Sequence, residues 1–155
     1  VVSNVVRLFR ESKFLPQGLD IVARVAPQDC EILGSADTLK QILVNLIKNA
    51  VEAMPRGGRI EIISGGPVQR DDRTFYSLRV KDNGPGIPPE YMDRVFDRFF
   101  RVPGTVGNGS GLGLAIVSEI AGFHHASVTM DPVSHEGGLN LQITFPALDT
   151  EGVTS

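Results

Sequence analysis

The chain has 155 residues, 41% hydrophobic and 21% charged, so it is long enough to bury a core as one soluble globular domain. Its net charge of −3 is spread along the chain, which disfavours nucleic-acid binding. No apolar run approaches the roughly 18 residues of a membrane span, and the single cysteine, Cys30, cannot form an internal disulfide. We therefore expect a domain from a reducing compartment that contacts neither nucleic acid nor membrane.

The first half of the chain mixes helix and strand patterns. Apolar residues at helical spacing predict a helix over 3–14, and two short apolar segments, 19–25 and 30–34, are typical of strands. The clearest helix is predicted at 38–54, where apolar residues recur at i, i+3, i+4 and i+7. Asp37 is the expected N-cap of this helix.

The second half contains further strands and two helices. In chain order we expect strands 59–64 and 75–80, a short helix at 90–100, a helix at 112–123, and strands 126–130 and 139–145. The first two strands should form a hairpin that turns within 69–73. The mixed order of elements predicts an α+β fold, in which helices pack on one face of a mixed, mostly antiparallel sheet to give a two-layer sandwich.

Glycine is concentrated in residues 104–114, GTVGNGSGLGL, which contain five glycines and lead into the helix predicted at 112–123. A glycine-rich loop before a helix can bring backbone N–H groups close to phosphate, although a mobile surface loop explains the composition equally well. Neither GxxxxGK[ST] nor GxGxxG is present, so the two standard phosphate-binding fingerprints do not apply.

A second glycine cluster, DNGPGI (82–87), follows the strand predicted at 75–80. The carboxylate of Asp82 could accept a hydrogen bond from an exocyclic amine such as that of adenine, and the glycines would let a flat ligand approach the backbone. The alternative is an ordinary Asx-type turn without a ligand.

Two asparagines, Asn45 and Asn49, lie four residues apart and so share one face of the helix predicted at 38–54. Asparagine is a poor helix former, so two of them in a helix interior call for a reason. They could point at water, or their amide oxygens could help to hold Mg²⁺ at the edge of a pocket.

Together, four segments resemble the nucleotide-binding boxes of the histidine-kinase ATP-binding catalytic domain, a member of the GHKL ATPase/kinase superfamily. These segments are NLIKNAVEAM (45–54), DNGPGI (82–87), VFDRFFR (95–101) and GSGLGLAIV (109–117), in this order and spacing. The likeness extends over 1–147 and leaves 148–155 as a tail. It implies the Bergerat-type ATP-binding fold with a flexible ATP lid.

The resemblance also implies roles for individual residues. Asn49 would be the Mg²⁺ ligand, Asn45 its neighbour in the pocket, and Asp82 the carboxylate that reads adenine. The base pocket would be shaped by Gly84, Gly86 and Ile87. In the lid, Phe96, Phe99 and Phe100 would be hydrophobic anchors, with packing in the core as the alternative. The rest of the lid and the phosphate-facing helix start would include Gly109, Ser110, Gly111, Leu112, Gly113 and Leu114.

Two basic residues have less definite expected roles. Arg98 would contact phosphate or another domain. Many members of the family carry Lys-Tyr where this chain has Glu52-Ala53, so Lys48 is the candidate replacement for the missing lysine. A solvated surface position is the alternative for Arg98.

The implied reaction is transfer of the γ-phosphate of ATP to a histidine. In the ATPases of this superfamily a glutamate four residues before the magnesium asparagine activates water, whereas Asn45 occupies that position here and an amide cannot act as a general base. This disfavours a topoisomerase-like ATPase. A stand-alone serine kinase of the anti-sigma type and a non-catalytic interaction module remain alternatives.

The acceptor histidine itself is not apparent in this chain. None of His124, His125 and His135 has the sequence setting of a phosphoacceptor, and surface or C-cap roles are expected for the first two. The expected partners are therefore a separate dimerisation and phosphoacceptor domain, and a response regulator downstream. We expect this chain to be a cytoplasmic catalytic fragment that is monomeric by itself, with the phosphoacceptor helices preceding Val1. The parent protein is expected to be a homodimer, and the sequence leaves open whether it is anchored to a membrane.

Overall fold

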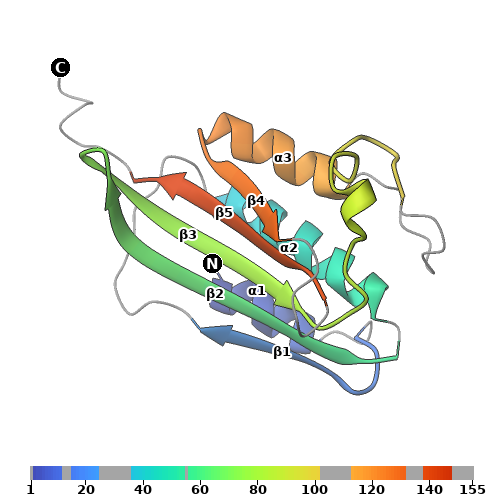
Figure 1. The fold of residues 1–155 in the computed structure, drawn as a ribbon. Helices are drawn as coiled ribbons and strands as arrows, with labels where there is room; N and C mark the ends of the chain where they lie inside the picture. The colour runs from blue at the N-terminus through green and yellow to red at the C-terminus, as the bar shows by residue number, and fades with distance from the viewer. Residues whose placement is uncertain are drawn as a thin grey trace.

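The computed structural model describes residues 2–11, 15–24, 36–54, 56–101, 113–131 and 138–147. Figure 1 shows two layers, with one sheet covered on one face by the helices. The elements are α1 (Val2–Arg10), β1 (Leu19–Arg24), α2 (Ala36–Ala53), β2 (Gly58–Arg70), β3 (Arg73–Asp82), the 3₁₀ helix η1 (Pro89–Tyr91), α3 (Gly113–Phe123), β4 (Ser127–Asp131) and β5 (Asn140–Pro146). The predicted α+β sandwich is confirmed.

The sheet is mixed but mostly antiparallel. Its strand order is β1-β2-β3-β5-β4, and the pair β1 and β2 is parallel while the other three pairs are antiparallel. A parallel pair needs a crossover connection, and α2 lies between β1 and β2 in the sequence. Within the described part of the chain, no helix is long and apolar enough to cross a membrane.

The core lies between the sheet and the helices. Side chains alternate along β3 and β5, so that Leu78, Val80, Leu141 and Ile143 are buried while the residues between them are more exposed. From α2, the fully buried side chains on its inner face are those of Ile42, Leu43 and Ile47. Burial of each such side chain contributes about 1.5–3 kcal/mol, which makes this layer contact the main source of stability.

The helix boundaries differ from the predictions by a few residues. Helix α2 begins at Ala36, so Asp37 lies in its first turn and is not the N-cap; a carboxylate in that position still interacts favourably with the helix dipole. Helix α1 ends at Arg10, whose guanidinium donates two hydrogen bonds to the carbonyl of Ile21 in β1. The predicted strand 30–34 lies outside the described residues.

The β2–β3 hairpin is longer than the sequence pattern indicated. It turns at Asp71 and Asp72, whose φ angles of 51° and 62° suit a tight hairpin turn within the predicted range 69–73. Strand β2 continues through a glycine- and proline-containing stretch, with a shift of register between Gly65 and Val68. Such a bulge accommodates residues that otherwise interrupt a strand, which explains why the pattern underestimated its length.

The prediction of a helix at 90–100 is wrong. Only η1 forms there, and it is followed by turns; Phe99 has a φ of 66°, which an α-helix does not allow. The segment is held by tertiary contacts instead: Val95 is buried in the core, and Tyr91 and Phe100, whose rings lie 5.9 Å apart, pack against it. The other late predictions are confirmed to within two residues by α3, β4 and β5.

Candidate functional site

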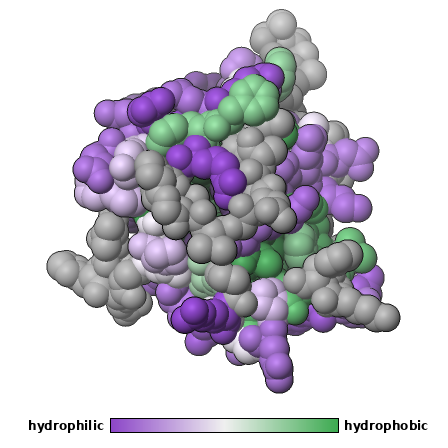
Figure 2. All heavy atoms as spheres, turned by 90° about the vertical axis from the view of Figure 1, so that its right-hand side faces the viewer, coloured by the Kyte–Doolittle hydropathy of each residue, from purple (hydrophilic) through white to green (hydrophobic). Residues whose placement is uncertain are grey.

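The described candidate residues come together at one end of the sandwich. Helix α2 and strand β3 both run toward the right-hand end of Figure 1, and α3 begins there. Figure 2 shows this end facing the viewer, with green hydrophobic surface in its lower half among purple hydrophilic residues. An end that presents both apolar and polar surface suits a ligand with a flat base and charged groups.

The side chains of Asn45 and Asn49 lie close to the start of α3. A Cβ atom added to Gly113, the first residue of α3, would lie 3.3 Å from Oδ1 of Asn49 and 3.9 Å from Oδ1 of Asn45. The amide nitrogen of Asn45 donates a hydrogen bond to the carbonyl of Gln41 at 2.9 Å, one turn earlier on α2. The two amide oxygens thus lie beside a helix N-terminus, where unpaired N–H groups favour an anion such as phosphate.

Their neighbours divide into exposed and buried side chains. Lys48 is exposed on α2 and carries a charge near Asn45 and Asn49 in the sequence. Leu114, the second residue of α3, is only 8% exposed and belongs to the hydrophobic core. Gly109, Ser110, Gly111 and Leu112, predicted to complete this region, lie outside the described residues.

Asp82 ends β3 and is buried, with 7% of its surface exposed. Its Oδ1 accepts hydrogen bonds from the backbone N–H groups of Gly84, at 2.9 Å, and Leu139, at 3.2 Å. The backbone N–H of Asp82 also donates to the carbonyl of Leu139 at 2.9 Å. Since both bonds to the carboxylate reach Oδ1, Oδ2 accepts no hydrogen bond from the described residues and can accept one from a ligand.

The environment of Asp82 also alters its acidity. Burial raises the pKa of the Asp82 carboxyl, because removal from water disfavours the charged form. The hydrogen bonds from Gly84 and Leu139 act in the opposite direction by stabilising the carboxylate. A buried carboxyl with a perturbed pKa at the end of a strand is a functional-site candidate.

The turn after Asp82 packs too closely for side chains. A Cβ added to Gly84 would lie 2.9 Å from Cγ of Met54, and one added to Gly86, where φ is 73°, would lie 2.8 Å from the carbonyl oxygen of Gly138. The next residue, Ile87, is half-buried and packs against the core. The turn therefore needs glycine at both positions because Met54 and Gly138 pack against its backbone.

The aromatic residues of segment 95–101 behave differently from one another. Phe96 and Phe100 are half-buried against the core, whereas Phe99 is 70% exposed and does not act as a hydrophobic anchor in this structure. The guanidinium carbon of Arg94 lies 4.6 Å from the centre of the Phe100 ring. Arg98 is exposed and forms an ion pair with Glu119 of α3.

His124 directly follows the last residue of α3, as the predicted C-cap role requires, but it is buried, with 6% exposed, and not at the surface. One ring nitrogen lies 2.8 Å from the carbonyl oxygen of Ile120, and the other lies 2.9 Å from the hydroxyl of Thr38 in the first turn of α2. The packing of the end of α3 against the start of α2 supplies this partner, which the sequence does not reveal. His125 is exposed, and His135 lies outside the described residues.

Three contributors to the site were missed by sequence reasoning. Met54 ends the segment NLIKNAVEAM but had no expected role of its own, and the backbone N–H of Leu139 is a contact that no side-chain pattern signals. Glu119 had no distinguishing signal at all. The glycine pair just before the last predicted strand was the one available hint, since Gly138 approaches Gly86.

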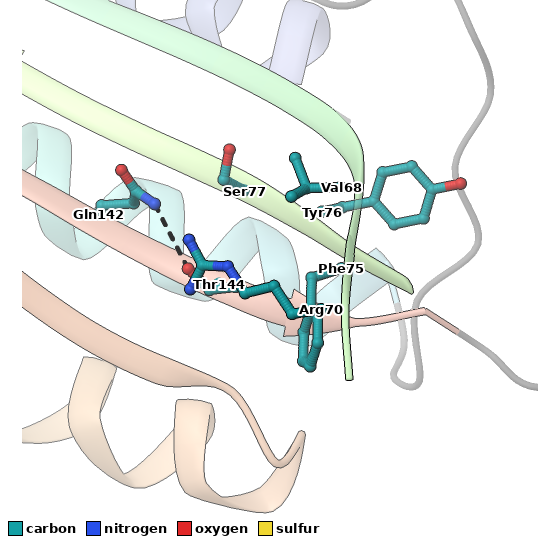
Figure 3. A pocket seen from close by; sticks show the side chains of 7 residues that line it. All are labelled: Val68, Arg70, Phe75, Tyr76, Ser77, Gln142 and Thr144. Atoms are coloured by element: carbon teal, nitrogen blue, oxygen red, sulfur yellow. Dashed lines mark hydrogen bonds between the residues drawn. The ribbon is translucent and has the colours of Figure 1, made fainter. Parts of the chain in front are cut away.

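A shallow depression on the sheet lies apart from these residues (Figure 3). It is lined by β2, β3 and β5, among them Val68, Phe75, Ser77 and Thr144, and none of the predicted site residues borders it. Gln142 donates a long hydrogen bond of 3.4 Å to the Thr144 hydroxyl there. The depression therefore has no part in the candidate site.

The residues present fit a nucleotide with a magnesium ion. Asp82 supplies a buried hydrogen-bond acceptor for a base, and Asn49 supplies an amide oxygen beside the start of α3. No cluster of three or more His, Cys, Asp or Glu side chains that could hold a metal occurs among the described residues. Mg²⁺ does not need one, because it is commonly bound through one or two protein oxygens together with phosphate and water.

Comparisons with known proteins show the family and the fold of this chain. The family model for histidine kinase-, DNA gyrase B-, and HSP90-like ATPases matches residues 34–149. The sensor protein kinase PmrB of Pseudomonas aeruginosa is 36% identical over 129 residues, which cover 82% of this chain and 26% of PmrB. Among solved structures, the mycobacterial sensor histidine kinase MprB is 29% identical, with a TM-score of 0.73 and coverage of 94% of this chain and 95% of that one. Full-length ShkA in complex with AMPPNP is 26% identical, with a TM-score of 0.73 and coverage of 94% and 29%.

The fold and the site together place the chain in the class of nucleotide-binding α+β sandwiches. The chain belongs to the histidine kinase-, DNA gyrase B- and HSP90-like ATPase family, and its named relatives are sensor histidine kinases. Membership of this family implies that the chain binds ATP. The chain spans about a quarter of the length of curated relatives such as PmrB and the Escherichia coli sensor protein CreC.

Proposed function

We propose that this chain is the ATP-binding catalytic domain of a sensor histidine kinase, formed by residues 1–147 with 148–155 as a tail. It binds Mg²⁺-ATP and directs the γ-phosphate to a histidine on a separate dimerisation and phosphoacceptor domain of the same parent protein, from which a response regulator is then phosphorylated. The observation that carries the proposal is the proximity of the Asn45 and Asn49 amide oxygens to the start of α3.

Each residue has a defined task in this proposal. Oδ2 of Asp82 accepts a hydrogen bond from the exocyclic amine of adenine, while Gly84 and Gly86 keep the base close to the backbone. Ile87 and Phe96 supply apolar surface beside the base. Asn49 holds Mg²⁺, and the start of α3 from Gly113 binds phosphate oxygens through backbone N–H groups.

For phosphoryl transfer the protein mainly has to position the reacting groups and neutralise the charge on the phosphates; it contributes little covalent chemistry. Bound Mg²⁺-ATP supplies the phosphoryl group and the metal's charge. Lys48, which is exposed on α2, adds positive charge near the phosphates. Asn45 places an amide where the related ATPases have a glutamate. Because an amide cannot take a proton from water, water is not activated and the phosphoryl group is kept for the histidine.

Calorimetric titration with a non-hydrolysable ATP analogue tests nucleotide binding, once with Mg²⁺ and once with a chelator. Binding that depends on magnesium and is lost in Asn49→Ala is the expected result. Lys40→Ala is the matched control, since Lys40 is exposed on α2 nine residues before Asn49, on the opposite side of the helix. Absence of binding by the unaltered chain at millimolar nucleotide contradicts the proposal.

A second assay tests the reaction. The chain is incubated with γ-labelled ATP and a phosphoacceptor domain from a sensor kinase, and the labelled product is exposed to acid and to alkali. A phosphohistidine loses its label in acid and keeps it in alkali, whereas a phosphoserine behaves in the opposite way. Alkali-labile label on a protein substrate would instead indicate a serine kinase.

A further inference from the structure

Segment 83–101 follows Asp82 in the chain and runs from the end of β3 toward the start of α3 (Figure 1). Its inner side is held by the core through Val95, which is 5% exposed, and through Tyr91 and Phe100, which pack against the core. Arg98 lies on the other side of the segment, with 63% of its side chain exposed. Its guanidinium Nη2 donates to Oε1 of Glu119.

Glu119 belongs to α3. It lies six residues after Gly113 on α3, on the exposed side of the helix, and 50% of its side chain is exposed. An α-helix is rigid over this length, so a contact at Glu119 constrains the position of Gly113 as well. The pair therefore joins the segment that begins at Asp82 to the helix that begins beside Asn49.

The ion pair with Glu119 differs from the phosphate contact that was expected for Arg98. Its guanidinium is engaged by a carboxylate of α3, so in this arrangement Arg98 is placed to act on a nucleotide through that helix. We infer that Arg98 is a positioning residue: through Glu119 it sets the separation of the Asp82 turn, where the base is proposed to bind, from the N-terminus of α3, where the phosphates are proposed to bind. This inference rests on the proposed function.

Charge reversal separates this role from direct phosphate binding. Arg98→Glu and Glu119→Arg each place like charges opposite one another, and we expect each to weaken binding of the non-hydrolysable ATP analogue about fivefold, in line with the energies of exposed ion pairs. The double variant Arg98→Glu/Glu119→Arg restores an opposite-charge pair and should bind within about twofold of the unaltered chain. Arg24→Glu on β1 controls for the change in net charge.

Amide hydrogen exchange without nucleotide provides the second measurement. Residues 95–101 and the first turn of α3 should exchange faster in Arg98→Glu and return to normal in the double variant. If the double variant binds no better than Arg98→Glu, Arg98 contacts phosphate directly and the inference is overturned. Unchanged exchange in Arg98→Glu overturns it too, since the pair then positions nothing. Loss of binding by the unaltered chain refutes the proposed function instead, and the exchange data still decide the role of the pair.

Discussion

The side-chain oxygen of Asn49 lies against Gly113, so that a Cβ atom on this glycine would be 3.3 Å from it. The contact joins the middle of one helix to the first residue of another that follows 64 positions later in the chain. It brings a candidate metal ligand to a helix N-terminus, where phosphate is favoured.

Gly113→Ala should weaken magnesium-dependent nucleotide binding while leaving the melting temperature unchanged or slightly raised. The added methyl group displaces the Asn49 amide by a few tenths of an ångström, whereas alanine is the better helix former. The matched control is Gly122→Ala on the same helix, because a Cβ there meets no atom within 4 Å. This control should stabilise the chain by up to about 1 kcal/mol and leave the affinity unchanged. Equal affinities for both variants would contradict a role for the Asn49–Gly113 contact.

Asp82→Asn should lower the affinity for adenine nucleotides by about 1.5–3 kcal/mol, roughly tenfold to more than a hundredfold. The amide oxygen can still accept the bonds from Gly84 and Leu139, but the new NH₂ group would face the amine of adenine with a second donor. Titration with adenine and guanine nucleotides measures the change, with Asp20→Asn on the exposed side of β1 as the control. An equal loss for both bases would show that Asp82 does not read the base.

The raised pKa of Asp82 predicts how stability depends on pH. A carboxyl whose pKa is higher in the folded than in the unfolded state binds more protons when folded, so its stabilising contribution is full below the unfolded pKa and is lost as pH rises through the folded pKa. Asp82→Asn removes this dependence, and the unaltered chain should lose stability relative to the variant as pH rises from about 4 toward 7. Urea titrations of both proteins across that range measure the difference, and a constant offset would contradict the prediction.

Asn45→Glu should not by itself produce a fast ATPase. A glutamate on α2 would supply a carboxylate, but hydrolysis also needs a water held in line with the γ-phosphate. The assay is phosphate release under saturating Mg²⁺-ATP, with Gln41→Glu as a control that adds a carboxylate one turn earlier on an exposed part of α2. A rate that rises by several orders of magnitude only in Asn45→Glu would mean that this position alone decides between hydrolysis and transfer.

Elements with strong local patterns were predictable from the sequence. The alternation in β5 and the periodic apolar residues of α2 place buried side chains on one side, and the structure confirms both to within about two residues. The segment 90–100 was not predictable in the same way, because its aromatic spacing resembles a helix while its real conformation depends on packing of Val95 and Phe100 against distant elements.

The sequence by itself determined which chemical groups this protein has and in what order they follow: two asparagines on a helix, a carboxylate at the end of a strand, and glycines beyond it. Only the tertiary structure decided which of them meet. The contacts of Asn49 with Gly113, of Asp82 with Leu139 and of Arg98 with Glu119 join residues 64, 57 and 21 positions apart. Local propensities act within a few residues, so such contacts follow from how the helices pack on the sheet and from the strand order that brings β5 beside β3.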